Sequence, residues 1–215
     1  MAKKQRLDKA IAMQGSLSRS EVKTLIRKGA VTVNGQVVKN SDFGVDFDSD
    51  TVAVQGKELS LSMHIYLMLN KPKGVVSASE DKKLPTVVDL VPKELWRKGL
   101  FPAGRLDKDT TGFVLITDDG EFAHDILSPK KHISKTYHAL VNGTITDEMV
   151  EGFAKGVTIG EDFTLPASLK KISSEEQGDW GEVILKEGMY HQIKRMFEAL
   201  GCRVEYLKRI SMGPL

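Results

Sequence analysis

The chain has 215 residues, of which 40% are hydrophobic and 28% are charged, as in ordinary globular proteins. Its single cysteine, Cys202, excludes an internal disulfide and a multi-cysteine metal site, and fits a reducing compartment. No apolar run approaches the roughly 18 residues that a membrane span needs, and no apolar signal core follows the polar N-terminus. We therefore expect a soluble, cytoplasmic protein with one large or two small domains.

The charge is unevenly distributed along the chain. Residues 1–40 carry nine lysines and arginines against Asp8 and Glu21. Residues 41–60 carry Lys57 against five acidic residues, and the remainder is nearly neutral. A basic N-terminal segment on a nearly neutral chain favours a polyanionic partner.

Two short helices are predicted in the basic segment. Leu7, Ala10 and Ile11 have the i, i+3, i+4 spacing of an amphipathic helix. Ser18-Arg-Ser-Glu21 fits a capping box at the start of a second helix, and Gly29 is placed to end it. The residues that follow should turn into extended structure.

A β-hairpin is predicted directly after the second helix. Asn34-Gly35 lies between the apolar runs 30–33 and 36–38, and this dipeptide is a strong hairpin signal. The acidic stretch 41–50 is expected to complete a small sheet. Residues 55–63 are expected to form a linker to the rest of the chain.

A basic stripe marks the second helix. Arg19, Lys23 and Arg27 recur every four residues, and Lys28 follows them. One interpretation is a solvated helix surface. However, the stripe has no acidic partner four residues away, and a phosphate backbone would offset the repulsion between its charges. We therefore predict that these four residues bind RNA.

The N-terminal segment resembles the S4 domain, an RNA-binding module of ribosomal proteins and RNA-modifying enzymes. The resemblance lies in Arg6-Leu-Asp8, Ser18-Arg-Ser-Glu21 and the run Ile26-Arg-Lys-Gly-Ala-Val-Thr-Val-Asn-Gly35. It implies binding of structured RNA through shape and phosphates, and it does not by itself imply catalysis. On this basis residues 1–60 are assigned to a small α/β S4-like domain with its linker.

The remaining residues, 61–215, are predicted to form an α+β domain with a mainly antiparallel, mixed sheet flanked by helices. Apolar runs between turn residues predict strands at 65–69, 113–117, 135–141, 181–185 and 204–210. Helical spacing predicts helices at 121–127, 146–154 and 190–200. Asn142-Gly143 is interpreted as a further hairpin signal.

Three segments of this domain place charged and polar residues in predicted turns or strands. They are Gly104-Arg-Leu-Asp-Lys-Asp-Thr-Thr-Gly112, Lys135-Thr-Tyr137 and Glu187-Gly-Met-Tyr-His-Gln-Ile-Lys-Arg-Met196. Singly, each has an ordinary structural explanation as a turn, a core strand or a basic helix surface. The histidines lack the spacing of metal ligands, and no serine occupies a Gly-x-Ser-x-Gly elbow. We therefore expect no metal and no cofactor.

Together, these segments resemble the pseudouridine synthases, specifically the RsuA branch that modifies ribosomal RNA. Asn70-Lys-Pro-Lys-Gly74 and Ser128-Pro-Lys-Lys131 also fit, and an S4 domain before the catalytic domain is typical of this branch. The resemblance implies an enzyme, expected to be monomeric, that isomerises uridine in 16S small-subunit ribosomal RNA. Two alternatives stay open: the same chemistry on large-subunit RNA, and a non-catalytic S4-type ribosome-assembly factor.

The resemblance also assigns roles to residues. Asp107 is the implied nucleophile, attacking the ribose C1′ or the uracil ring, and Lys194 pairs with it to keep it ionised. Tyr137 is expected to stack on the extruded uracil, and Arg105 to hold the flipped nucleotide's backbone. Gly104, Leu106 and Ile193 are expected to shape the uracil pocket. The rival carboxylates are Asp109, Asp118 and Asp119.

Overall fold

The computed structural model describes residues 4–15, 17–128 and 131–215, which form two compact units. Unit 1 comprises Met1–Tyr66, Leu90–Phe101 and Thr117–Asp119, and unit 2 comprises Leu67–Asp89, Pro102–Ile116 and Gly120–Leu215. Two residues of the Ser128-Pro-Lys-Lys131 segment, Pro129 and Lys130, lie outside the described residues.

Unit 1 begins with the two predicted helices, α1 (Leu7–Ala12) and α2 (Arg19–Arg27). The capping box is confirmed, since the Ser18 backbone N–H donates to the Glu21 carboxylate over 2.8 Å and the Ser18 hydroxyl accepts from the Glu21 N–H. Gly29 follows the helix with φ 74°, in the left-handed region that ends helices. Local sequence signals therefore predict where α2 begins and ends.

The sheet of unit 1 has the strand order β3-β2-β5-β6. Its strands are β2 (Val31–Val33), β3 (Gln36–Val37), β5 (Val52–Val54) and β6 (Lys57–Leu59), and β1 (Gln5–Arg6) pairs separately with β4 (Gly44–Val45). The predicted hairpin turn is confirmed, with Asn34 at φ 52° and Gly35 at φ 78°. Apolar side chains of the helices and this sheet form one buried core.

The predicted linker over residues 55–63 is wrong for its first half. Gln55 and Gly56 both have positive φ, 51° and 78°, and they turn the chain back so that β6 pairs with β5. Glutamine rarely adopts the left-handed conformation, so the dipeptide Gln-Gly does not predict a turn as Asn-Gly does. Leu59 and Leu61 then pack against the core of unit 1.

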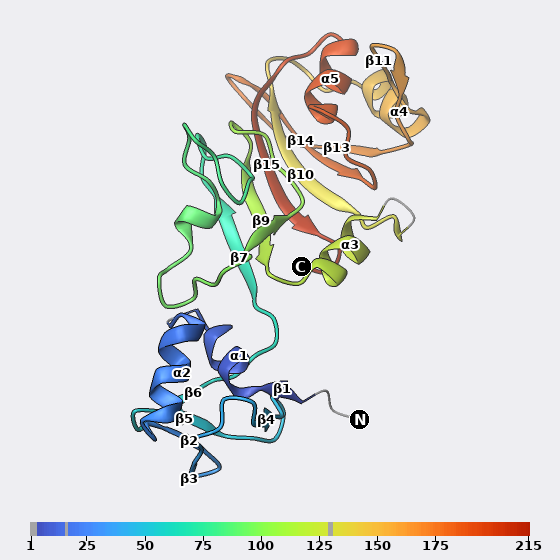
Figure 1. Cartoon of the computed structure of the whole chain (residues 1–215). Helices are drawn as coiled ribbons and strands as arrows, with labels where there is room; N and C mark the ends of the chain where they lie inside the picture. The colour runs from blue at the N-terminus through green and yellow to red at the C-terminus, as the bar shows by residue number, and fades with distance from the viewer. Residues whose placement is uncertain (1–3, 16, 129–130) are drawn as a thin grey trace. The chain divides into compact units, whose positions relative to one another are not determined.

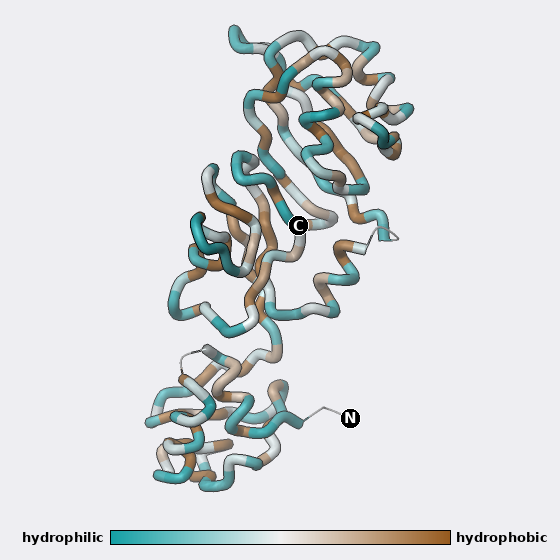
Figure 2. Tube along the Cα trace, turned by 45° about the horizontal axis from the view of Figure 1, so that its top comes forward, coloured by the Kyte–Doolittle hydropathy of each residue, from teal (hydrophilic) through white to brown (hydrophobic). Residues whose placement is uncertain are grey.

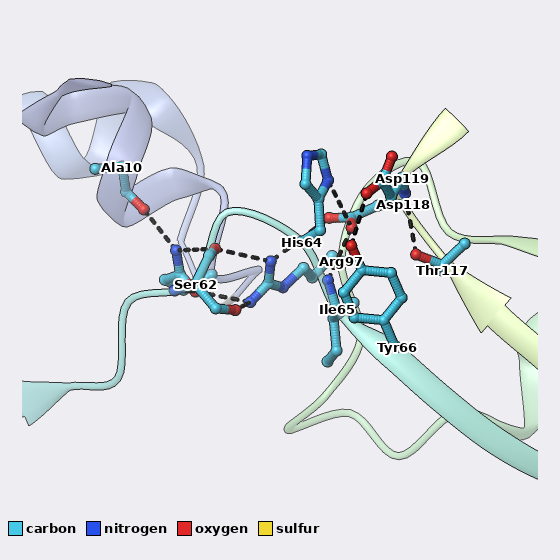
Figure 3. Close-up of polar contacts among 10 residues, drawn as sticks. Ala10, Ser62, His64, Ile65, Tyr66, Arg97, Thr117, Asp118 and Asp119 are labelled. Carbon is cyan, nitrogen blue, oxygen red and sulfur yellow. Dashed lines mark hydrogen bonds and ion pairs between the residues drawn. The ribbon is translucent and has the colours of Figure 1, made fainter. Parts of the chain in front are cut away.

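Arg97 ties the segment Leu90–Phe101 to the rest of unit 1 (Figure 3). Its Nη2 donates to Gln14 Oε1 over 2.8 Å and to Ser62 Oγ over 2.7 Å. Its Nη1 lies 3.2 Å from the Ser62 carbonyl oxygen and 3.5 Å from Asp118 Oδ2. This buried guanidinium is therefore both hydrogen-bonded and paired, as a buried cation requires.

Unit 2 is built on a sheet with the order β13-β14-β10-β15-β9-β7, to which β8 adds by pairing with β9. The strands are β7 (Tyr66–Lys71), β8 (Phe101–Ala103), β9 (Thr111–Thr117), β10 (Lys135–Val141), β13 (Ser168–Glu175), β14 (Gly178–Leu185) and β15 (Val204–Met212). The β13–β14, β14–β10 and β10–β15 pairs are antiparallel, whereas β15 and β9 are parallel. The predicted mixed sheet is confirmed.

The helices of unit 2 are α3 (Gly120–Leu127), α4 (Asp147–Lys155) and α5 (Gln192–Ala199), and a 3-10 turn covers Val88–Leu90. A small hairpin joins β11 (Thr158–Ile159) to β12 (Asp162–Phe163). In Figure 1, α4 and α5 lie side by side next to β11, and the rings of Phe153 and Phe197 are 4.9 Å apart. The ring contact packs α4 against the last turn of α5.

Two features of unit 2 differ from the sequence prediction. Asn142-Gly143 forms no hairpin, because β10 is followed by the Thr146 cap of α4 and pairs with β14 and β15. The sequence does not predict β13, because most of its residues are polar. In the structure, Leu169 is the one buried side chain of this strand. Its pairing with β14, rather than burial, therefore defines it.

Hydrophobic and hydrophilic residues follow one another at short intervals along the chain (Figure 2). In β14, buried and half-buried positions alternate over the whole strand, as in a sheet with one covered face. Among the described residues, no helix combines the length and the apolar character that crossing a membrane requires.

Candidate active site

A pocket of about 290 Å³ lies in unit 2, between the loop after β8, the strands β10 and β15, and the turn before α5. It brings together residues that are far apart in the chain. Five of the residues predicted from the sequence line it: Arg105, Leu106, Asp107, Tyr137 and Ile193.

The loop that carries Asp107 is bounded by two glycines with positive φ, Gly104 at 96° and Gly112 at 100°. A Cβ atom at Gly112 would collide with the backbone of Arg209 on the neighbouring strand β15. Only glycine permits this close approach in this conformation. Gly104 is not among the residues that line the pocket, and with its positive φ it turns the chain into the loop.

Lys71 supports the same loop from within unit 2. Its side chain is 1% exposed, and its Nζ donates to the carbonyl oxygens of Pro72 over 3.0 Å, Lys108 over 3.2 Å and Thr110 over 2.8 Å. Burial lowers the pKa of Lys71, while the nearby carboxylates of the loop act in the opposite direction. This buried ammonium therefore holds the backbone of Lys108 and Thr110, which follow Asp107 in the loop.

The carboxylate of Asp107 lies between two nitrogen-bearing side chains. Lys194 Nζ is 3.4 Å from its Oδ2, and His191 Nε2 is 3.4 Å from its Oδ1. Lys194 lies closer still to Asp109, at 2.7 and 2.8 Å from the two carboxylate oxygens. The predicted pairing of Lys194 with Asp107 therefore exists, but Lys194 is shared by two carboxylates.

The contact with Lys194 affects the pKa of Asp109. Burial tends to raise the pKa of Asp109, but the hydrogen bonds and charge of Lys194 outweigh it, and the pKa is lowered. Asp109 therefore stays ionised and neutralises part of the Lys194 charge. Asp118 and Asp119, the other rival carboxylates, belong to unit 1, where Asp118 pairs with Arg97.

Part of the pocket lining is apolar and aromatic. Tyr137 of β10 is 8% exposed, and Ile193 in the first turn of α5 is 4% exposed. Leu207 of β15 also lines the pocket. A pocket of this size lined by a carboxylate and by aromatic and apolar side chains suits a planar ring with polar edges.

The sequence did not indicate His191 or Tyr190 as site residues, although both lie in the Glu187–Met196 segment. His191 occupies the N-cap position of α5 with φ 49°, a left-handed conformation that is strained for a residue with a side chain. Its ring stacks on that of Tyr190, with centroids 3.9 Å apart and planes at 16°. The residue types alone predict neither the left-handed backbone of His191 nor its stacking on Tyr190.

The RNA-binding residues predicted on α2 lie in unit 1 and differ in their partners. Asp8 of α1 is fully buried and lies 3.1 Å from Arg19 Nε and 3.8 Å from Lys23 Nζ. The expectation of an unpaired stripe is thus wrong for these two residues, because their acidic partner comes from another helix. Arg27 and Lys28 are exposed, and Arg27 donates to Thr24 of its own helix.

Comparison with known proteins agrees with this architecture. Residues 65–199 match the model of the RNA pseudouridylate synthase family, and residues 5–52 match the S4 domain. An uncharacterised RNA pseudouridine synthase of Bacillus subtilis is 44% identical over 209 residues, which cover 97% of this chain and 87% of that protein. Ribosomal small subunit pseudouridine synthase A of Escherichia coli is 42% identical over 213 residues, covering 97% and 89%.

The crystal structure of a pseudouridylate synthase is also similar, with a TM-score of 0.62 and 36% identity over 98% of this chain and 89% of that one. An S4 unit and a mixed-sheet unit with a carboxylate-bearing pocket define an RNA-modifying enzyme of the isomerase class. The chain belongs to the RNA pseudouridine synthase family, as its motifs predict.

Proposed function

We propose that this enzyme converts one uridine of 16S small-subunit ribosomal RNA to pseudouridine, as a cytoplasmic monomer, with Asp107 as the nucleophile. The observation that carries the proposal is the Asp107 carboxylate, which lies between Lys194 and His191 in a pocket that Tyr137 also lines. The small-subunit substrate is supported by the 42% identity to the Escherichia coli enzyme, whose name specifies that subunit.

The reaction needs a base that has left its stack, because the reacting atoms are inaccessible in a helix. The extruded uracil enters against Tyr137 and Ile193, and Arg105 holds the rearranged backbone. Asp107 attacks the ribose C1′ or the uracil ring, and the N1–C1′ bond breaks. The uracil turns and rejoins C1′ through C5, and the bond to Asp107 breaks, which regenerates the free carboxylate. C5 loses a proton and N1 gains one, so no oxidant or reductant is consumed. Lys194 keeps the attacking carboxylate ionised and oriented.

The substitution Asp107→Asn tests the catalytic role. We expect it to abolish pseudouridine formation on 16S RNA and to leave RNA binding nearly intact, because the amide keeps the shape but not the nucleophile. Asp125→Asn, at an exposed position of α3, is the matched control and should retain full activity. An Asp107→Asn enzyme that forms pseudouridine at the normal rate would refute the assignment.

Large-subunit RNA is the second candidate substrate. Ribosomal large subunit pseudouridine synthase B of Bacillus subtilis is 39% identical over 208 residues, nearly as similar as the small-subunit enzyme. Carbodiimide mapping of both ribosomal RNAs, with and without the gene, separates the candidates by the subunit that loses a pseudouridine. If neither RNA loses one, the protein is a non-catalytic RNA-binding or assembly factor.

A further inference from the structure

The stacked pair Tyr190–His191 lies on the edge of the pocket that contains Asp107. Tyr190 is 74% exposed, so one face of its ring is open to solvent while His191 covers the other. Both residues line the pocket, but neither contributes to the buried wall formed by Tyr137 and Ile193. A large aromatic face is thus exposed directly beside the site of the reaction.

The backbone around this pair is held in place by several hydrogen bonds. The Met189 N–H donates to Gln192 Oε1 over 2.9 Å, and the Arg195 N–H donates to the His191 carbonyl over 3.0 Å. His191 itself has a left-handed backbone and approaches Asp107 to 3.4 Å. The exposed tyrosine is therefore mounted on a turn of fixed geometry, which lowers the entropy cost of binding a ligand to it.

We propose that the Tyr190–His191 pair is a stacking platform for a nucleobase adjacent to the target uridine. The inference rests on the proposed function and extends the binding site by one nucleotide. When a uridine leaves its stack, the neighbouring base loses a stacking partner, and an aromatic ring can replace it. The uracil itself is matched by Tyr137, whose ring is buried, whereas an exposed ring at the edge suits a base that stays outside the pocket.

The platform is linked to the nucleophile through one residue. His191 contacts the Tyr190 ring on one side and Asp107 through Nε2. A base stacked on Tyr190 would limit the movement of this imidazole and so hold the histidine beside Asp107. The platform should therefore act on RNA binding and base extrusion, and much less on the chemical step.

Kinetics with Tyr190 variants test the proposal. We expect Tyr190→Ala and Tyr190→Leu to raise the KM for RNA about tenfold, with kcat within about twofold, because both remove the aromatic face. Tyr190→Phe should restore the low KM, since stacking does not need the hydroxyl. Phe163→Ala removes an aromatic side chain that is 65% exposed on β12 and does not line the pocket, so it should leave both constants unchanged.

A fluorescence measurement reports stacking directly. RNA carrying 2-aminopurine on either side of the mapped uridine is bound to the Asp107→Asn enzyme, which holds the RNA without converting it. We expect quenching at one of the two positions, and loss of that quenching when Tyr190→Ala is added. Unchanged KM and quenching in the Tyr190 variants, or an effect on kcat alone, would overturn the platform. That result leaves the Asp107 assignment intact, which fails separately if Asp107→Asn retains activity.

Discussion

Lys194 Nζ lies 2.7 Å from Asp109 and 3.4 Å from Asp107, so the residue two positions past the proposed nucleophile holds the cation more closely. Charge-assisted hydrogen bonds are the strong ones at such distances, and Asp109 receives two of them. Asp107 is left with a weaker contact and therefore with a carboxylate that can reach a substrate. Asp109 is best understood as the residue that positions Lys194.

Asp109→Asn should therefore impair catalysis without abolishing it. Once the Asp109 charge is lost, Lys194 is expected to move onto Asp107 and to compete with the substrate for its oxygen. We expect kcat to fall about tenfold, or about 1.4 kcal/mol of barrier, with KM nearly unchanged. Single-turnover pseudouridine formation measures the effect. A loss as complete as that of Asp107→Asn would contradict the view that Asp109 only positions Lys194.

Lys71→Met should loosen the catalytic loop. Three backbone carbonyls would lose their buried donor, which is expected to cost about 3 kcal/mol of the free energy of unfolding and to lower kcat more than it raises KM. Urea unfolding and steady-state kinetics measure both effects. Lys73→Met, in the same segment but exposed, is the control and should change neither. Equal stability of the two variants would show that the Lys71 hydrogen bonds contribute nothing.

Unit 1 should lose stability in acid through Asp8. Burial raises the pKa of this carboxyl, but hydrogen bonds from Arg6 and Arg19 outweigh it and lower the pKa from its ordinary 3.8 to about 2. Because the folded pKa is the lower one, the stabilisation is complete above the ordinary value and is lost as the pH falls towards 2.

Asp8→Asn should accordingly lower the free energy of unfolding at pH 7 by about 2 kcal/mol, and the difference from the unaltered protein should shrink below pH 3. Urea unfolding at several pH values measures it, with the exposed Asp48→Asn as the control. A difference that stays constant between pH 7 and pH 2 would rule out the ion pairs as its cause.

Arg27 and Lys28 offer the cleanest test of RNA binding by the S4-like unit, because Arg19 and Lys23 also stabilise Asp8. Replacing both exposed residues with glutamine should weaken binding and reduce the slope of log K against log salt by about 1.5. Lys155→Gln on α4, whose side chain is 75% exposed, should leave the slope unchanged. An unaltered slope in the double variant would mean that Arg27 and Lys28 contact solvent rather than phosphate.

Short-range signals in the sequence predict much of this fold. The Ser18 capping box and the Asn34-Gly35 turn depend on residues within four positions of each other, and the structure places both as expected. These signals fail where strand pairing, rather than the local residue types, determines the secondary structure. β13 is a strand because β14 lies beside it, and β6 follows a turn in which Gln55 adopts a positive φ that is rare for glutamine.

Motifs in the sequence indicated the candidate site, but the contacts within it were not predictable. Lys194 and Asp109 are 85 residues apart in the chain, so no spacing rule shows which carboxylate the lysine prefers. The same holds for Asp8, which meets the basic stripe from another helix. His191 has a left-handed backbone at the N-cap of α5, and a histidine gives no local sign of this conformation.

Strand β15 joins the two halves of the unit 2 sheet, since β10 lies on one side of it and β9 on the other. Thr111, at the end of the Asp107 loop, pairs with a strand whose residues follow it by about 95 positions. At a synthesis rate of about 5–20 residues per second, the loop emerges from the ribosome roughly 5–20 seconds before its neighbour. The pocket therefore assembles only after β15 has emerged, and a nascent chain that lacks β15 should carry Asp107 in a loop not yet competent for catalysis.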